Sequence, residues 1–180
     1  MRFVLAAILA AALSTSRAAA QAIPLQPGQT VTIRIDNGQA VVEQTAPAEP
    51  MSKFEAYALW RAETTEVAAG VKVQPPGFIL QGEGPPNPPQ PGDNLLHLTM
   101  RRVPGLRPGS ADNTALFILN GYGSALRYRA IMRTNGRSVA TDVCDVAPNR
   151  LGLEHWPYAI DQLELSAFQL VPGNGQIQCG

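Results

Sequence analysis

The sequence predicts a mainly β protein, an antiparallel β-sandwich that is immunoglobulin-like in general shape. Seven or more short segments either alternate apolar and polar side chains or form short apolar runs, as strands do. Glycine and proline, with 16 residues each, separate these segments at short intervals, as turns do in all-β domains. At most one segment, about residues 53–69, has the composition of a helix. A distorted barrel is the alternative architecture.

Residues 1–20 are predicted to be a secretory signal peptide that precedes a single domain, residues 21–180. Arg2 provides a positive start, Phe3–Leu13 is apolar, and Ala18–Ala20 is a small-residue cleavage site. The apolar run is too short to span a bilayer comfortably, and no later stretch is long and apolar enough. We therefore expect cleavage directly after this alanine run and a periplasmic or secreted protein. An uncleaved N-terminal anchor is the alternative.

The remaining chain is close to electrical neutrality. Without Arg2 and Arg17, 12 of the 14 basic side chains are left against 14 acidic ones. A neutral chain lacks the positive charge that non-specific nucleic-acid binding requires, so no nucleic-acid partner is expected.

Residues 29–44 are predicted to form the first hairpin. Every second residue from Val31 to Ile35 is apolar, Asp36–Gly38 suits a turn with positive φ, and the chain then returns. The run Thr45–Pro50 is expected to be a spacer.

The helix candidate, about residues 53–69, carries two conflicting patterns. Ser52 and Glu55 have the spacing of a capping box, Gly70 suits a C-terminal stop, and the segment is rich in alanine and glutamate. Alternating apolar residues in the same segment are typical of a strand. We favour the helix.

Proline and glycine interrupt residues 71–93, where only Phe78–Leu80 is predicted as a short strand. The tract GPPNPPQPG, residues 84–92, has few backbone donors and should be extended. We interpret it as a crossover between the sheets; a ligand segment for a partner is the alternative.

Four later segments are predicted to form the centre of the fold. Residues 95–103 alternate, residues 114–119 form an apolar run typical of a strand buried on both faces, and residues 126–133 alternate again. Asn135-Gly136 precedes the fourth segment, 137–143, and is a strong hairpin signal because a type I′ turn needs positive φ twice. The last three segments are predicted to be consecutive antiparallel strands of one meander.

The rest of the chain has weaker patterns. Residues 148–158 are expected to be irregular. The apolar positions of residues 163–170 fall out of phase, which predicts one strand with a bulge near Ser166-Ala167. After a turn at residues 172–175, residues 177–179 are predicted as a last short strand.

The two cysteines, Cys144 and Cys179, are predicted to form a disulfide, because two cysteines in an exported chain usually pair. A thiol that binds a metal or acts as a nucleophile is the alternative.

Three sequence strings carry a resemblance to other proteins. They are NGYGSALRYRAIMR (Asn120–Arg133), TDVC (Thr141–Cys144) and EHWPY (Glu154–Tyr158), followed by a closing cysteine. Residues 114–179 resemble a group of exported proteobacterial proteins that have no assigned function. The resemblance implies a shared structure and no activity.

No catalytic, metal or cofactor motif stands out. Gly121–Ser124 does not form a nucleophile-elbow motif. His155 lies near Glu154 and Asp161, which makes an acid/base cluster conceivable, although a histidine that caps the core is the simpler interpretation. We therefore expect no catalytic residue, no cofactor and no metal.

Two other kinds of binding site are conceivable from the residue types present. His97, Met100, Cys144 and His155 are the residue types of a cupredoxin copper site, but their spacing does not fit one. Aromatic residues on a β-sandwich can bind sugars, although most of these are better interpreted as core or rim residues. The aromatic candidates are Tyr57, Trp60, Tyr122, Trp156 and Tyr158.

An arginine-rich sheet face is the remaining candidate site. If residues 95–103 and 126–134 lie in one sheet, their outward side chains form a possible anion-binding face, because guanidinium groups bind carboxylate and phosphate. A solvated face with cross-strand ion pairs is the alternative. The residues of this face are His97, Arg101, Arg127, Arg129 and Arg133.

These observations predict an exported, non-catalytic protein that binds a partner or a component of the cell envelope. The alternative is a carbohydrate-active or other hydrolase with an unrecognised site.

Overall fold

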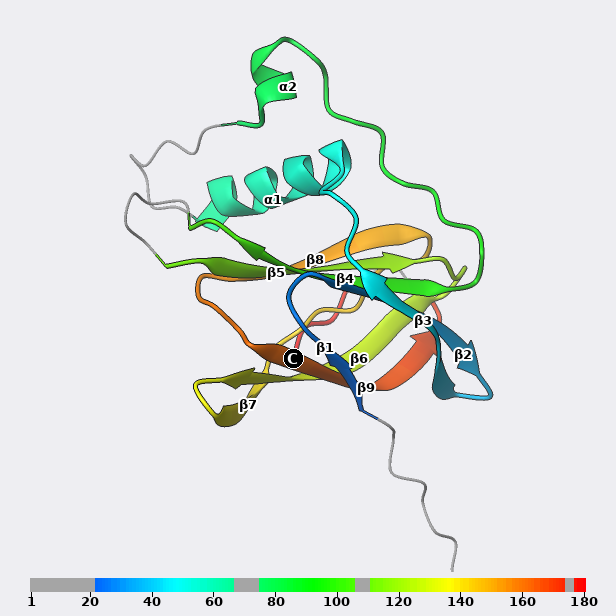
Figure 1. Ribbon diagram of the computed structural model, residues 1–180. Coiled ribbons are helices and arrows are strands. Elements are labelled where there is room, and N and C mark those ends of the chain that lie inside the picture. Colours follow the sequence, from blue (N-terminus) through cyan, green and yellow to red (C-terminus); the bar gives the residue numbers. More distant parts are fainter. Residues whose placement is uncertain (1–21, 67–74, 106–110, 174–176) are drawn as a thin grey trace, which may run out of the picture.

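Two antiparallel sheets pack face to face in the computed structural model, which describes residues 22–66, 75–105, 111–173 and 177–180 (Figure 1). One sheet has four strands in the order β1-β9-β6-β7, and the other has five in the order β3-β2-β4-β5-β8. This confirms the predicted antiparallel β-sandwich. The predicted signal peptide lies outside the described residues. The strands are β1 (Ile23–Leu25), β2 (Gln29–Asp36), β3 (Gln39–Pro47), β4 (Leu96–Val103), β5 (Asn113–Asn120), β6 (Ala125–Thr134), β7 (Arg137–Thr141), β8 (Arg150–Trp156) and β9 (Gln162–Val171).

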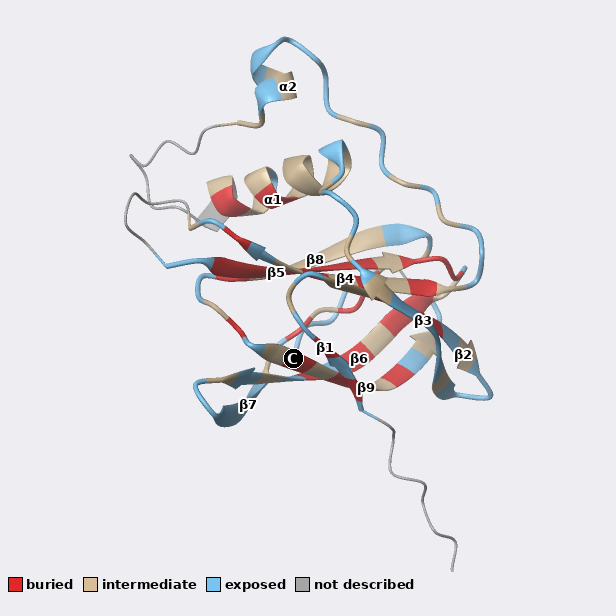
Figure 2. Cartoon of the chain, in the orientation of Figure 1, coloured by how far each residue is buried: buried red, intermediate tan, exposed pale blue. Residues whose placement is uncertain are grey.

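The main hydrophobic core lies between the two sheets (Figure 2). β4 shows how the alternating pattern builds it, because Leu96, Leu98 and Met100 are fully buried while the residues between them face outward. Leu126 of β6 and Leu163 of β9 contribute from the four-stranded sheet. Burial of each such side chain contributes about 1.5–3 kcal/mol to stability.

Helix α1 (Lys53–Glu66) covers the outer face of the five-stranded sheet (Figure 1). Leu59 packs with Ala115 and Phe117 of β5 in a second, smaller core. β5 is therefore buried on both faces, as its unbroken apolar run predicts.

The start of α1 confirms the predicted capping box. The Ser52 side-chain oxygen accepts a bond from the Glu55 N–H (3.1 Å), and the Glu55 carboxylate accepts one from the Ser52 N–H (2.7 Å). Arg101 of β4 fastens the same end of the helix, because its guanidinium donates to the Glu55 carboxylate at 3.2 Å and to the Glu49 carbonyl at 2.7 Å. The predicted stop at Gly70 lies outside the described residues.

The connection from β3 to β4 differs from the prediction in two ways. Phe78–Leu80 belongs to a single helical turn, α2 (Gly77–Leu80), because the Pro76 carbonyl accepts bonds from the N–H groups of Ile79 and Leu80. Residues 84–92 have no regular secondary structure, as expected, but they join α2 to β4. Since β3 and β4 both belong to the five-stranded sheet, this tract does not cross between the sheets.

Residues 148–158 were predicted to be irregular, and this was wrong. They contain β8, which pairs with β5 along its whole length from Arg150 to Trp156. The sequence RLGLEHW has no clear period of two, so the strand depends on pairing with a buried neighbour rather than on its own pattern. The short strand β1 was not predicted from the sequence either. Residues 177–179 were predicted to be a last short strand, but they contribute only one isolated bridge, Cys144 to Cys179.

Of the two strand pairings in the predicted meander, that of β6 with β7 is confirmed and that of β5 with β6 is wrong. β6 and β7 form the expected hairpin, with positive φ at Asn135 (50°) and Gly136 (73°). β5 and β6 do not pair, because they lie in different sheets.

A corner at Asn120 sends the chain from one sheet to the other. The fully buried Asn120 side chain donates to the carbonyls of Ser124 and Ala147 at 2.9 and 3.1 Å, and it accepts a bond from the Tyr122 N–H. The next residue must be glycine, because a Cβ on Gly121 would stand 2.7 Å from the Leu95 carbonyl oxygen.

The bulge predicted in β9 is confirmed. Ala167 has a φ of 54°, and the register of β9 with β6 shifts between Arg127 and Arg129. One residue of β6 therefore faces two residues of β9.

Replacing Gly136 with Val should destabilise the protein by about 1–3 kcal/mol, because a β-branched residue is strained at this positive φ. Urea unfolding monitored by circular dichroism would measure the change. Gly123→Val is the matched control: Gly123 has no positive φ, and a Cβ there meets nothing within 4 Å. Equal unfolding free energies for the two variants would contradict the assigned turn.

Candidate functional site

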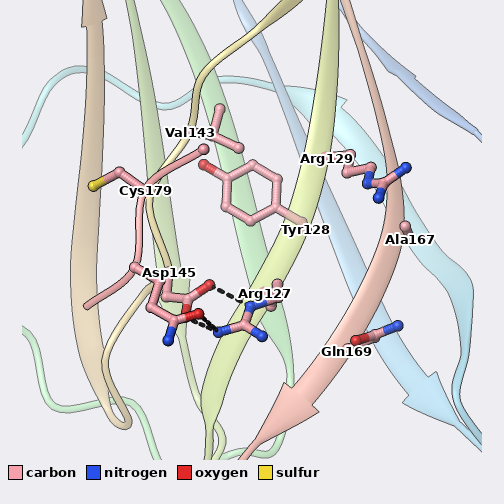
Figure 3. A pocket seen from close by; sticks show the side chains of 10 residues that line it. Arg127, Tyr128, Arg129, Val143, Asp145, Ala167, Gln169 and Cys179 are labelled. Atoms are coloured by element: carbon pink, nitrogen blue, oxygen red, sulfur yellow. Dashed lines mark hydrogen bonds and ion pairs between the residues drawn. The ribbon is translucent and has the colours of Figure 1, made fainter. Parts of the chain in front are cut away.

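A pocket of about 360 Å³ lies beside the disulfide, where the outer face of the four-stranded sheet meets the end of the chain (Figure 3). We call it the β6 pocket. Arg127 and Arg129 alternate along β6 with core residues, which places both on this outer face. The pocket is lined by Arg127, Tyr128, Arg129, Val143, Asp145, Ala167, Gln169, Gln178, Cys179 and Gly180.

The pocket interrupts the pairing of β6. Ala130 pairs with Thr141, and Leu126 exchanges two backbone hydrogen bonds of 2.8 Å with Val146. Between them, four residues of the returning chain (142–145) face three residues of β6, and on this side of β6 Tyr128 has no pairing partner among the described residues. Backbone groups of alternate residues point to the same side of a strand, so the N–H and C=O of Tyr128 point toward this gap.

Arg127 is held in place at one side of the pocket. Its Nε and Nη2 donate to the two carboxylate oxygens of Asp145 at 3.0 and 2.8 Å, and Nη2 also donates to the side-chain oxygen of Gln178 at 2.6 Å. The bond to Asp145 raises the pKa of Arg127 above its ordinary value. Because the Asp145 side chain is only 7% exposed, this two-point ion pair fixes both groups.

Arg129 differs from its neighbour. It is exposed, and its guanidinium makes no hydrogen bond or ion pair with any residue that the structure describes. Figure 3 shows it pointing away from the Arg127–Asp145 pair. Its charge is therefore available to a ligand in the pocket.

The predicted disulfide closes one wall of the pocket. Cys144 and Cys179 are bonded, and no described cysteine is free. The Gln178 carbonyl accepts a bond from the Asp145 N–H at 2.8 Å, and the Val143 carbonyl accepts one from the Gly180 N–H at 3.2 Å. The crosslink thus holds residues 178–180 against the segment that carries Asp145.

Glu154 of β8 lies behind this wall. Its carboxylate accepts bonds from the Cys144 N–H at 2.7 Å and from the Tyr128 hydroxyl at 3.4 Å. Burial raises the pKa of the Glu154 carboxyl, and the two bonds oppose this rise. Burial, reinforced by the nearby Glu154 charge, also raises the pKa of Tyr128, so the Tyr128 hydroxyl stays protonated.

The predicted anion-binding face is not continuous, because β4 and β6 lie in different sheets. His97 bridges Thr32 and Asp93, and Arg101 contacts the start of α1. Among the β6 residues, Arg133 forms an ion pair of 2.5 Å with Glu164. Of the five predicted residues, the β6 pocket brings together Arg127 and Arg129.

The acid/base cluster that we considered does not form. Glu154 and His155 are adjacent on β8 and so face opposite sides of the sheet. His155 lies on the α1 side, 3.8 Å from Glu63 and 3.2 Å from the Asn113 amide nitrogen. Asp161 accepts a bond from the Asn135 N–H instead.

The other two candidate sites also separate. Cys144 is in a disulfide, so it is not a copper ligand, and the described residues contain no group of three metal-binding side chains. Tyr122 and Trp156 are buried in the main core, whereas Tyr57 and Trp60 contact each other on α1. Tyr158 is 39% exposed.

Comparison with known proteins found no matching family model, no matching curated protein and no matching solved structure. The resemblance of residues 114–179 to exported proteobacterial proteins therefore stays a prediction. Neither α1 nor α2, the two helices of the described residues, is long and apolar enough to cross a membrane.

Reduction of the disulfide should lower the melting temperature, because the Cys144–Cys179 bond closes a loop across a sequence separation of 35 residues. The chain-entropy model gives about 3–4 kcal/mol for such a loop. Calorimetry with and without reductant would measure the shift. A thiol reagent should not react with the unfolded, unreduced protein, and two titratable thiols in that sample would contradict the bond.

Glu154→Gln should flatten the pH dependence of stability. Since the pKa of Glu154 is raised on folding, the folded state holds this proton more tightly than the unfolded state. Stability should fall as pH rises from the unfolded-state pKa through the folded-state pKa, and glutamine removes that fall while still accepting the Cys144 N–H bond. Urea unfolding from pH 4 to 8 would test this. The exposed Asp142→Asn is the control, and equal slopes in both variants would refute the assignment.

Proposed function

We propose that this chain is an exported, non-catalytic binding protein whose β6 pocket binds an anionic group of a partner or of a cell-envelope component. Export is supported by the sequence of residues 1–20 and by the disulfide, since such bonds persist in oxidising compartments. The mature protein would then be periplasmic or secreted.

The observation that carries the binding proposal is the Arg129 guanidinium, which lines a pocket without a partner among the described residues. A guanidinium offers five N–H donors in a planar fork that matches carboxylate and phosphate groups. The pocket volume of about 360 Å³ falls within the range of roughly 300–1,000 Å³ that is typical of small-ligand sites. The pocket is therefore large enough for an anionic group together with its neighbouring atoms.

The hydrolase alternative has less support. It required Glu154, His155 and Asp161 to converge in one cleft, and these side chains lie in three separate environments. A binding role does not require these three side chains to meet in one cleft, and the β6 pocket with Arg129 is sufficient for it.

Titration with small anions tests the proposal. We expect sodium acetate, at constant ionic strength against sodium chloride, to move the nuclear magnetic resonance signals of the Tyr128 amide and the Arg129 side chain. Arg129→Gln should abolish the movement of the Tyr128 signal, because it removes the only charge in the pocket that lacks a partner among the described residues.

The matched control is Arg137→Gln. Arg137 is exposed on β7 outside the pocket, so the variant makes the same change in net charge. It should respond to acetate as the parent does. Equal responses of Arg129→Gln and the parent, or no response in the parent, would refute the proposal.

A further inference from the structure

We propose that the group bound by the β6 pocket is a carboxylate carried next to a peptide amide, an inference that rests on the proposed function. Three features of the pocket support this ligand: the charges of its side chains, the open pairing position at Tyr128, and the amide side chains on its walls.

The charge of the pocket suits a monoanion. Three charged side chains line it, namely Arg127, Arg129 and Asp145. Arg127 and Asp145 neutralise each other through their two-point ion pair, so Arg129 carries the one side-chain charge of the lining that has no partner among the described residues. A carboxylate matches this single charge, whereas a phosphate dianion would bring an unmatched charge close to the buried Asp145 carboxylate.

The hydrogen-bonding groups suit a peptide amide beside that carboxylate. Tyr128 presents one N–H and one C=O toward the gap, at the spacing of an antiparallel ladder whose flanking positions, Leu126 and Ala130, are already paired. A peptide group can satisfy both, since it carries one donor and one acceptor. Gln169 and Gln178 line the same pocket and offer further neutral donors and acceptors.

The bulge in β9 links these features. Ala167 lines the pocket, and its positive φ coincides with the register shift of β9 opposite Tyr128, between the positions of Arg127 and Arg129. One amide group of a ligand could therefore bond to the Tyr128 backbone while the adjacent carboxylate reaches the Arg129 guanidinium. Because β6 pairs with β9 and β7 and is not an edge strand, the ligand would contact its backbone at Tyr128 alone, from within the pocket.

Three peptide probes and inorganic phosphate test the inference with isotope-labelled protein in nuclear magnetic resonance titrations. The probes are N-acetyl-trialanine with a free carboxylate, the same peptide with an amidated end, and an amidated peptide with a central aspartate. We expect both carboxylate peptides to bind about tenfold or more tightly than the fully amidated peptide. The Tyr128 amide proton should move downfield on binding and become protected from hydrogen exchange.

Arg129→Gln should remove the preference for the carboxylate, and Arg137→Gln should retain it. The stronger of the two carboxylate probes shows whether a chain terminus or an acidic side chain is favoured, and either result supports the inference. Equal binding of the amidated peptide, a Tyr128 amide that does not respond, or tighter binding of phosphate would overturn it. If acetate still shifts the Tyr128 signal in the parent and not in Arg129→Gln, the proposed anion-binding function stands without the peptide inference. If acetate shifts no signal in the parent, the proposed function and the peptide inference are both refuted.

Discussion

The hydrogen bonds of the Asn120 side chain determine where the chain leaves one sheet and enters the other. This fully buried amide donates to carbonyls of two later segments, that of Ser124 directly before β6 and that of Ala147 after the disulfide segment. Tyr122, positioned by the same side chain, accepts a bond from the Ile35 N–H and so connects the corner to β2. Loss of a buried polar partner costs about 1–3 kcal/mol, so this corner contributes strongly to the fold.

The corner also explains why the two sheets have different surroundings. β5 stays in the five-stranded sheet, where Arg101 and the capping box hold α1 over its outer side. β6 enters the four-stranded sheet, whose outer side carries the charged residues Arg127, Arg129 and Arg133. The helix thus covers β5 and its neighbours β4 and β8 in one sheet, and the β6 pocket lies on the other.

The sequence predicted those parts of the fold that depend on local patterns. The β2–β3 and β6–β7 hairpins, the capping box at Ser52 and the bulge at Ala167 all follow from neighbouring residues. It did not predict β8 or the separation of β5 from β6, because these depend on which distant strands pair. Two arginines of the pocket were candidates, and the phase slip at Ser166-Ala167 was the one signal for its shape. Gln169, Gln178 and the Tyr128 backbone carried no sequence signal, since only the tertiary structure brings them together.

Because α1 covers only one sheet, amino-acid substitutions should cost different amounts of stability on the two sheets. A residue under the helix, such as Phe117, is packed on every side, so its replacement by alanine would cost about 3–5 kcal/mol. Exposed residues on the opposite sheet, such as Arg129 and Gln169, can be replaced within about 0.5 kcal/mol. Ligand preference can therefore diversify among variants of this chain, or be redesigned, without a matching loss of the folded state.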